Sequence, residues 1–230
     1  MNYLLKKLNF AVAFVVATAL LVLGSVGIAY AAPTSEFTQV INAGVLTADM
    51  VDGSFNSIAA PNVPLSDVTF GFTCQQSTGT FGTTSAQIYA ANPAVTTGAW
   101  ALTLAASSVN DLWTSAGNGS LQFDFNDEGG SPAGCADSGD ADSVAGQMTI
   151  DPSGATLANG QCTGCTTTGA SLGASAAFSS VVSSITIVSF SAASDDSADY
   201  TIQGVGVTQQ IPQQQAVAND YAIDLVLTAA

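Results

Sequence analysis

The stretch YAIDLVLT, residues 221–228, alternates large apolar side chains with other residues. Its odd-numbered positions, from Tyr221 to Leu227, are all apolar and would line one face of an extended segment. This period of two is typical of a β-strand that buries one face in a core. Together with the residue before it, the stretch therefore predicts a strand over Asp220–Thr228 near the end of the chain.

The same period recurs along most of the chain, and the segments between the runs are rich in Gly, Pro, Asn and Ser. No apolar stripe repeats at the three- and four-residue spacing of a helix. Residues 153–175 are expected to form a connection rich in Gly, Ser, Thr and Ala. We therefore expect an all-β fold: a single β-sandwich of about 8–10 short, mainly antiparallel strands with a long acidic loop, spanning residues 32–230. The other expected strands are Val45–Val51, Asp67–Cys74, Ala86–Ala90, Trp100–Leu104, Leu121–Phe125, Met148–Ile150, Ser184–Phe190 and Asp199–Val207.

Residues 1–31 have the three parts of a secretory signal peptide: a basic start, an apolar run from Phe10 to Ile28, and a small-x-small site at Ala29–Ala31. We expect cleavage before Ala32 and a secreted protein, extracellular or on the cell surface. The alternative is a retained membrane anchor, because the apolar region is long enough to span a bilayer.

Lys6 and Lys7 are the only basic residues, and the chain has no histidine, whereas it has 17 acidic residues. Such a chain cannot neutralise phosphates, so we expect no nucleic-acid partner and, once the signal is removed, no membrane partner. The usual general bases and the Ser-His and Cys-His nucleophile arrangements are also absent. No pair of carboxylates stands out for glycoside hydrolysis. We therefore expect that the protein is not an enzyme.

Residues 124–151 carry seven of the 17 acidic side chains, interspersed with glycines. Carboxylate and amide oxygens on a flexible, Gly-rich loop suit calcium, which takes six to eight oxygen ligands. The spacing differs from that of the twelve-residue helix-loop-helix site, and the alternative is a solvated acidic loop that binds nothing. We predict a calcium site. The candidate ligands are Asp124, Asn126, Asp127, Asp137, Asp140 and Asp142.

Four cysteines in a secreted chain permit two disulfides in three pairings. They are Cys74, Cys135, Cys162 and Cys165. A bridge from Cys135 to Cys162 or Cys165 would join the acidic loop to the following connection. The Cys-x-x-Cys spacing also fits a redox pair or half of a zinc site, but no histidine and no second Cys-x-x-Cys accompany it. We expect structural disulfides.

The two tryptophans are the candidate binding residues. Trp100 alternates with apolar neighbours, which is typical of a core position. Trp113 follows Asp111 in a short polar segment, so we expect it to be exposed and able to stack on a sugar or a protein partner.

Short motifs spread over most of the chain carry a family resemblance. They are Gly44-Val45-Leu46, Val68-Thr69-Phe70-Gly71, Gly98-Ala99-Trp100-Ala101-Leu102, Ile211-Pro212, and Tyr221 with Leu225-Val226-Leu227. In this order they resemble the strands of the WxL domain of Gram-positive surface proteins. Leu225 stands where that family has its second Trp, and the acidic loop is foreign to it. The resemblance implies noncovalent attachment to cell-wall polysaccharide, namely peptidoglycan.

A signal peptide followed by one acidic sandwich also resembles the secreted fibre subunits of the camelysin and TasA type. That resemblance implies polymerisation, in which an extended segment of one copy completes a sheet of the next. The donor would be Ala32–Val40 (APTSEFTQV), which is otherwise interpreted as a disordered tail. We expect a structural or adhesive surface or matrix protein that associates with copies of itself and is stabilised by calcium. A module that binds cell-wall polysaccharide is the alternative.

Overall fold

The structure, a computed structural model, describes residues 39, 44–93, 98–138, 142–194 and 197–230. All of these except Gln39 belong to one compact unit, Asn42–Ala230. The predicted signal peptide, and all of the predicted donor segment apart from Gln39, lie outside the described residues.

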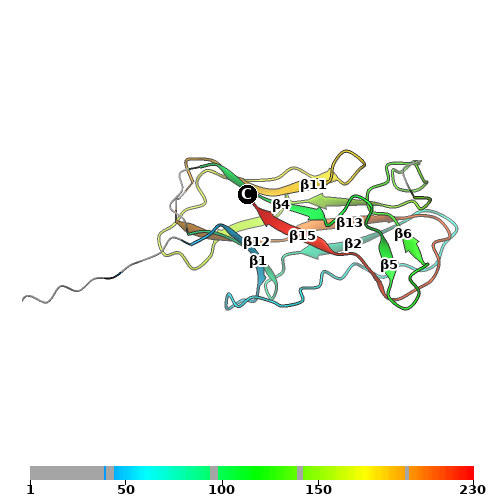
Figure 1. The fold of residues 1–230 in the computed structure, drawn as a ribbon, viewed down its shortest axis with the longest axis horizontal. Coiled ribbons are helices and arrows are strands. Elements are labelled where there is room, and N and C mark those ends of the chain that lie inside the picture. Colours follow the sequence, from blue (N-terminus) through cyan, green and yellow to red (C-terminus); the bar gives the residue numbers. More distant parts are fainter. Residues whose placement is uncertain (1–38, 40–43, 94–97, 139–141, 195–196) are drawn as a thin grey trace, which may run out of the picture. The chain divides into compact units, whose positions relative to one another are not determined.

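The described residues form strands and no helix (Figure 1). The strands are β1 (Thr47–Val51), β2 (Gln75–Phe81), β3 (Gln87–Asn92), β4 (Trp100–Ala106), β5 (Trp113–Ser115), β6 (Gln122–Phe123), β7 (Gln147–Asp151), β8 (Thr156–Asn159), β9 (Ala170–Leu172), β10 (Ala176–Ala177), β11 (Ser184–Phe190), β12 (Ala198–Gln203), β13 (Val205–Ile211), β14 (Tyr221–Ala222) and β15 (Leu225–Ala229). The predicted all-β class is confirmed, and the short polar strands raise the number of strands above the expected range.

Every strand pairing is antiparallel, and the sheet orders are β1-β3-β12-β8, β10-β7-β13-β2, β15-β4-β11-β9 and β14-β5-β6. The first two sheets form one continuous layer, because β12 and β13 are two halves of a long strand interrupted at Gly204. Gly204 has a φ of 84°, a conformation that favours glycine, and its N–H donates to the carbonyl of Gly82 at 2.7 Å. The neighbouring strands are also interrupted at the level of Gly204. One interruption lies between β2 and β3, and the other lies between β7 and β8.

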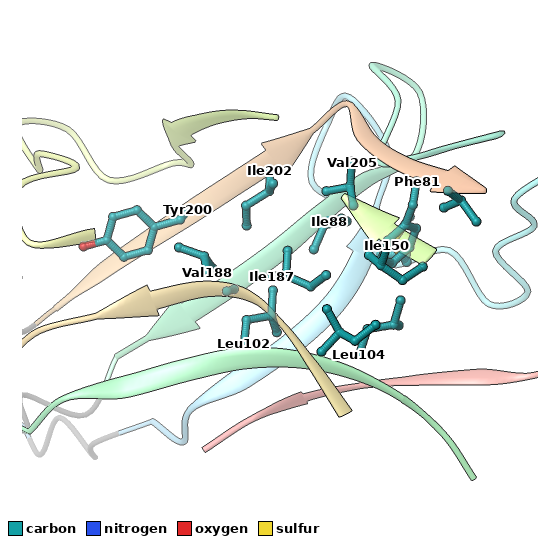
Figure 2. Packing of buried hydrophobic residues seen from close by; sticks show 14 of the residues in the cluster. Phe81, Ile88, Leu102, Leu104, Ile150, Ile187, Val188, Tyr200, Ile202 and Val205 are labelled. Carbon is teal, nitrogen blue, oxygen red and sulfur yellow. The ribbon is translucent and has the colours of Figure 1, made fainter. Parts of the chain in front are cut away.

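The sheet β15-β4-β11-β9 forms the second layer of the sandwich, and a single core lies between the layers. Figure 2 shows side chains of both layers meeting there, with Ile88 and Ile202 from the first layer and Leu102 and Ile187 from the second. These four side chains are fully buried. Fully burying one such side chain stabilises the fold by about 1.5–3 kcal/mol. Burial of side chains between the two layers of the β-sandwich therefore stabilises this unit.

The strands predicted from apolar alternation are present in β1, β3, β4, β7, β11, β12 and β13. The single strand predicted at the end of the chain is wrong in its extent, because it is divided into β14 and β15, which belong to different sheets. The predicted strand Leu121–Phe125 is shorter, since only Gln122–Phe123 is assigned as β6, although Phe125 remains buried. Two strands, β8 and β9, lie in the segment expected to be a connection, and β10 follows directly after it.

The predicted strand Asp67–Cys74 is wrong. Val68, Phe70 and Phe72 are 40, 47 and 73% exposed, and none of them belongs to a strand. The strand in this region is β2, which follows the predicted segment. Its outer edge is covered by the chain just before that segment, where Leu65 bridges Gly79. Leu65 therefore already covers the edge of β2, and the residues from Val68 onward do not pair there.

Candidate functional site

The predicted metal ligands fall into a buried group and an outer group. Asp124, Asn126 and Asp127 are 0, 5 and 1% exposed, whereas Asp137 is exposed and Asp142 is half-buried. Asp140 lies outside the described residues. Within the part of the chain that the structure describes, no three acidic or cysteine side chains come together as metal ligands. A calcium site formed by all six predicted ligands therefore stays a prediction.

Two of these carboxylates accept hydrogen bonds from other residues of the acidic loop. Asp127 accepts hydrogen bonds from the N–H of Gly129 at 3.2 Å and from the N–H of Ser138 at 3.0 Å, and the Ser138 hydroxyl also bonds to it. Asp142 accepts from the N–H of Val144 at 2.9 Å. Asp127 thereby holds the two ends of the Gly-rich segment together.

The cysteines form the disulfides Cys74–Cys135 and Cys162–Cys165, with Cα–Cα distances of 5.5 and 5.7 Å. The suggested bridge from Cys135 to the later pair is wrong. The loop next to Cys135 lies on β7 and β13, because a Cβ on Gly134 would lie 2.6 Å from Cβ of Gln147 and 3.0 Å from Cβ of Gln210. Since β2 is the other neighbour of β13, Cys74 at the start of β2 is the partner within reach.

The second disulfide is fixed to β12 by a buried carboxylate. Asp199 accepts hydrogen bonds from the N–H groups of Gln161 and Cys162 at 2.7 and 2.8 Å, and from the Tyr89 hydroxyl at 2.9 Å. Burial and the neighbouring Asp199 raise the pKa of Tyr89 to about 12. These backbone contacts fix the loop that carries the disulfide, which fits a structural role for this cysteine pair.

Both candidate tryptophans stack on aromatic side chains of the fold. Trp100 is buried and stacks on Phe190, with ring centroids 3.8 Å apart and the planes 13° from parallel. The prediction of Trp113 as an exposed side chain is wrong, since Trp113 is half-buried and lies on Phe123 with centroids 5.6 Å apart. Its indole N–H donates to the buried Gln209 at 2.9 Å. Trp113 keeps part of its surface exposed, so its role in binding a sugar or a partner stays a prediction.

The outer edge of β15, on the side away from β4, exposes backbone groups rather than a cluster of side chains. β15 pairs with β4, and Ala230 just beyond it exchanges two backbone hydrogen bonds with Ala101, at 2.8 and 3.1 Å. In an antiparallel ladder the bonded pairs alternate, so Thr228 also bonds to β4 while Leu227 and Ala229 direct their N–H and C=O groups away from it. By the same alternation Leu225 is directed outward. No hydrogen bond from another described residue reaches these outward groups.

β1 lies next to this edge, and Leu46 and Ala48 on its outward side form no backbone hydrogen bond with another described residue there, although the end of β1 does. The carbonyl of Met50 accepts from Ile58 at 2.8 Å on the side away from β3, so the backbone of Ala48, two residues earlier, also points away from β3. β1 and β15 are in contact but share no ladder (Figure 1). We call the outward edges of these two strands the open seam. Its residues are Leu46, Ala48, Leu225, Leu227 and Ala229, all partly buried and packed against the core.

The chemistry of the open seam suits an added strand. β15 carries no charged residue and no proline, the features with which proteins usually protect an edge from pairing with other chains. Other edges are protected or short: β2 is covered near Leu65, while β8, β9 and β10 have four, three and two residues. The alternation in the sequence predicted the strand β15, but its place at an edge depends on pairings distant in sequence and has no local signal.

Among the described residues there is no helix of the length and apolarity needed to cross a membrane. In comparisons with known proteins, no family model, no curated protein and no solved structure matches this chain.

Proposed function

We propose that the protein is a secreted, non-enzymatic subunit of a cell surface or extracellular matrix, and that it associates with further copies of itself by adding a strand to the open seam. The observation that carries this proposal is the outward edge of β15, where the backbone groups of Leu225, Leu227 and Ala229 form no hydrogen bond with any residue that the structure describes. A strand edge of this kind is a template for another chain.

Backbone pairing fits the electrostatics of this protein. The formal net charge of the whole chain is −15, and both basic residues lie in the predicted signal peptide. Two copies of the chain from Ala32 onward therefore repel each other and have no basic side chain for an ion pair across an interface. Main-chain hydrogen bonds require no charge, and each stabilises by about 0.5–1.5 kcal/mol. The half-buried apolar residues of the seam would be covered at the same time.

The proposed donor is Ala32–Val40 of a second copy, the segment that the predicted signal cleavage places at the N-terminus. Its nine residues can span about 30 Å when extended, more than the length of β15. The binding of cell-wall polysaccharide is not put forward here, because both tryptophans are engaged within the fold.

The test is the mass of the protein in solution. Sedimentation of the chain starting at Ala32 is expected to show species larger than one copy, growing with concentration, and the chain starting at Ile41 is expected to remain a single copy. Two copies or more in the shortened chain would contradict the donor segment. A single copy in both chains would contradict self-association. If the segment instead covers the seam of its own chain, removing it lowers the thermal midpoint without changing the mass.

A further inference from the structure

The dipeptide Asn-Gly occurs twice in the chain, at Asn118-Gly119 and at Asn159-Gly160. In this dipeptide the backbone nitrogen of the glycine can attack the side-chain amide of the asparagine before it, because glycine has no side chain to hinder the approach. The attack requires that the fold leaves both groups accessible. The same dipeptide in two environments therefore shows what the fold contributes to this reaction.

Asn118 and Gly119 are exposed and lie in the turn between β5 and β6. The backbone carbonyl of Asn118 accepts from the N–H of Leu121 at 2.9 Å, which closes the turn. The N–H of Gly119 donates to no described residue, and a Cβ at Gly119 would have no atom within 4 Å of it. The attacking nitrogen is thus unhindered by its surroundings.

The side-chain carbonyl of Asn118 accepts two hydrogen bonds. Its Oδ1 accepts from the N–H of Ser120 at 3.2 Å and from the Ser120 hydroxyl at 2.7 Å, which folds the side chain over the turn. Negative charge develops on Oδ1 when a nucleophile adds to Cγ, and these two donors stabilise that charge. The amide nitrogen Nδ2, which has to leave, forms no hydrogen bond with a described residue.

Asn159 and Gly160 have the opposite arrangement. The N–H of Gly160 donates to the carbonyl of Asp199 at 2.8 Å, and the amide nitrogen of Asn159 donates to the carbonyl of Cys165. Oδ1 of Asn159 is buried and accepts no hydrogen bond from any described residue. The attacking nitrogen and the leaving group are both engaged here, and no donor stabilises the developing charge. Reaction at Asn159 therefore requires local opening of the fold.

We propose that Asn118 is a site of spontaneous deamidation and that the fold protects Asn159 from the same reaction. The Gly119 nitrogen forms a bond to Cγ of Asn118 and loses its proton to water, while the Cγ–Nδ2 bond breaks and Nδ2 leaves as ammonia with a proton from the solvent. Water then opens the resulting cyclic succinimide at either of its carbonyls, which gives aspartate or isoaspartate. The net reaction takes up water, releases ammonia and adds a negative charge to the turn. It involves no second copy of the chain.

The test follows the chain starting at Ala32, which contains the whole compact unit, during incubation in mildly alkaline buffer. No lysine or arginine follows Lys7, so the samples are digested with pepsin in acid, which also stops the reaction. Mass spectrometry should show aspartate and isoaspartate forming at Asn118 at least about tenfold faster than at Asn159, which corresponds to an opening free energy of about 1.4 kcal/mol at Asn159. In the chain unfolded in urea, the two sites should react at similar rates.

Gly119→Ala is the matched variant. Gly119 does not have a positive φ and its surroundings are open, so the variant should fold, as circular dichroism melting will verify. The added methyl group hinders the attack, and modification of Asn118 should be several-fold slower. The proposal is overturned if Asn118 stays unmodified, if Asn118 and Asn159 react equally fast in the folded chain, or if Gly119→Ala leaves the rate unchanged. A difference between the two sites that persists undiminished in urea also overturns it, because the fold would then not be the cause.

Discussion

At the scale of single residues, a few buried polar side chains connect elements that are far apart in sequence. Gln209 on β13 accepts from the Trp113 indole and donates to the backbone carbonyl of Asp124 at 2.9 Å, which joins the small sheet β14-β5-β6 to the sandwich. Asp199 does the same for the Cys162–Cys165 loop and Tyr89. Each of these side chains forms hydrogen bonds with backbone groups of a distant segment.

The Tyr89 hydroxyl gives a prediction in alkaline solution. Its pKa is about 12 in the folded protein against 10.0 for the free side chain, so the unfolded chain releases this proton at lower pH. The stability linked to Tyr89 is complete below pH 10 and is lost as the pH rises from 10 towards about 12. Urea midpoints at pH 8 and pH 11.5 should therefore differ more for the parent than for Tyr89→Phe. Equal differences in the two proteins would show that the Tyr89 contact is not made.

At the scale of elements, two disulfides of very different span fix two loops. Cys74–Cys135 closes a sequence separation of 61 residues and ties the acidic loop to the start of β2. Cys162–Cys165 closes a separation of three residues. The entropy that a crosslink removes from the unfolded chain grows with the length of the closed loop.

Replacing Cys74 and Cys135 together by Ser should lower the free energy of unfolding by about 4 kcal/mol. Replacing Cys162 and Cys165 together should lower it by about 2 kcal/mol. Chemical denaturation of the two double variants measures both values. A larger loss for the Cys162–Cys165 pair would mean that the loop fixed by Asp199 contributes more than its span predicts.

The edge of β15 allows a matched pair of proline substitutions. Ala229→Pro removes an N–H that points out of the sheet, so the fold should persist while association is lost. Thr228→Pro removes an N–H that bonds to β4, so it should lower the thermal midpoint strongly. Circular dichroism melting and sedimentation distinguish the two effects. Undiminished association of a folded Ala229→Pro variant would place the contact between copies elsewhere.

The strands that bury an apolar face could be predicted from the sequence, as β4, β11 and β15 show. β2, with the sequence QQSTGTF, could not, because its polar residues are held extended by pairing with β13 rather than by a buried face of their own. The buried position of Asp124 and Asn126 was also not predictable, since an acidic loop normally lies in solvent. Which carboxylates are buried depends on contacts such as the hydrogen bond from Asp124 to Ala145 and the bridge between Asn126 and Gln147, which only the fold creates.

At the scale of the whole molecule, a strongly acidic chain has few ways to bind another copy of itself. Its net charge of −15 opposes association at every distance within a Debye length, about 8 Å at physiological salt. We propose that the uncharged edge of β15 makes this contact through backbone groups rather than side-chain charges.

Residue-resolved hydrogen exchange along β15 tests strand addition at the open seam most directly. In the single copy, the outward amides of Leu225, Leu227 and Ala229 should exchange fast, while those of Val226 and Thr228, bonded to β4, are protected. In the associated protein all five should be protected. Outward amides that remain fast in the associated protein, or that are already protected in the single copy, would contradict strand addition at the open seam.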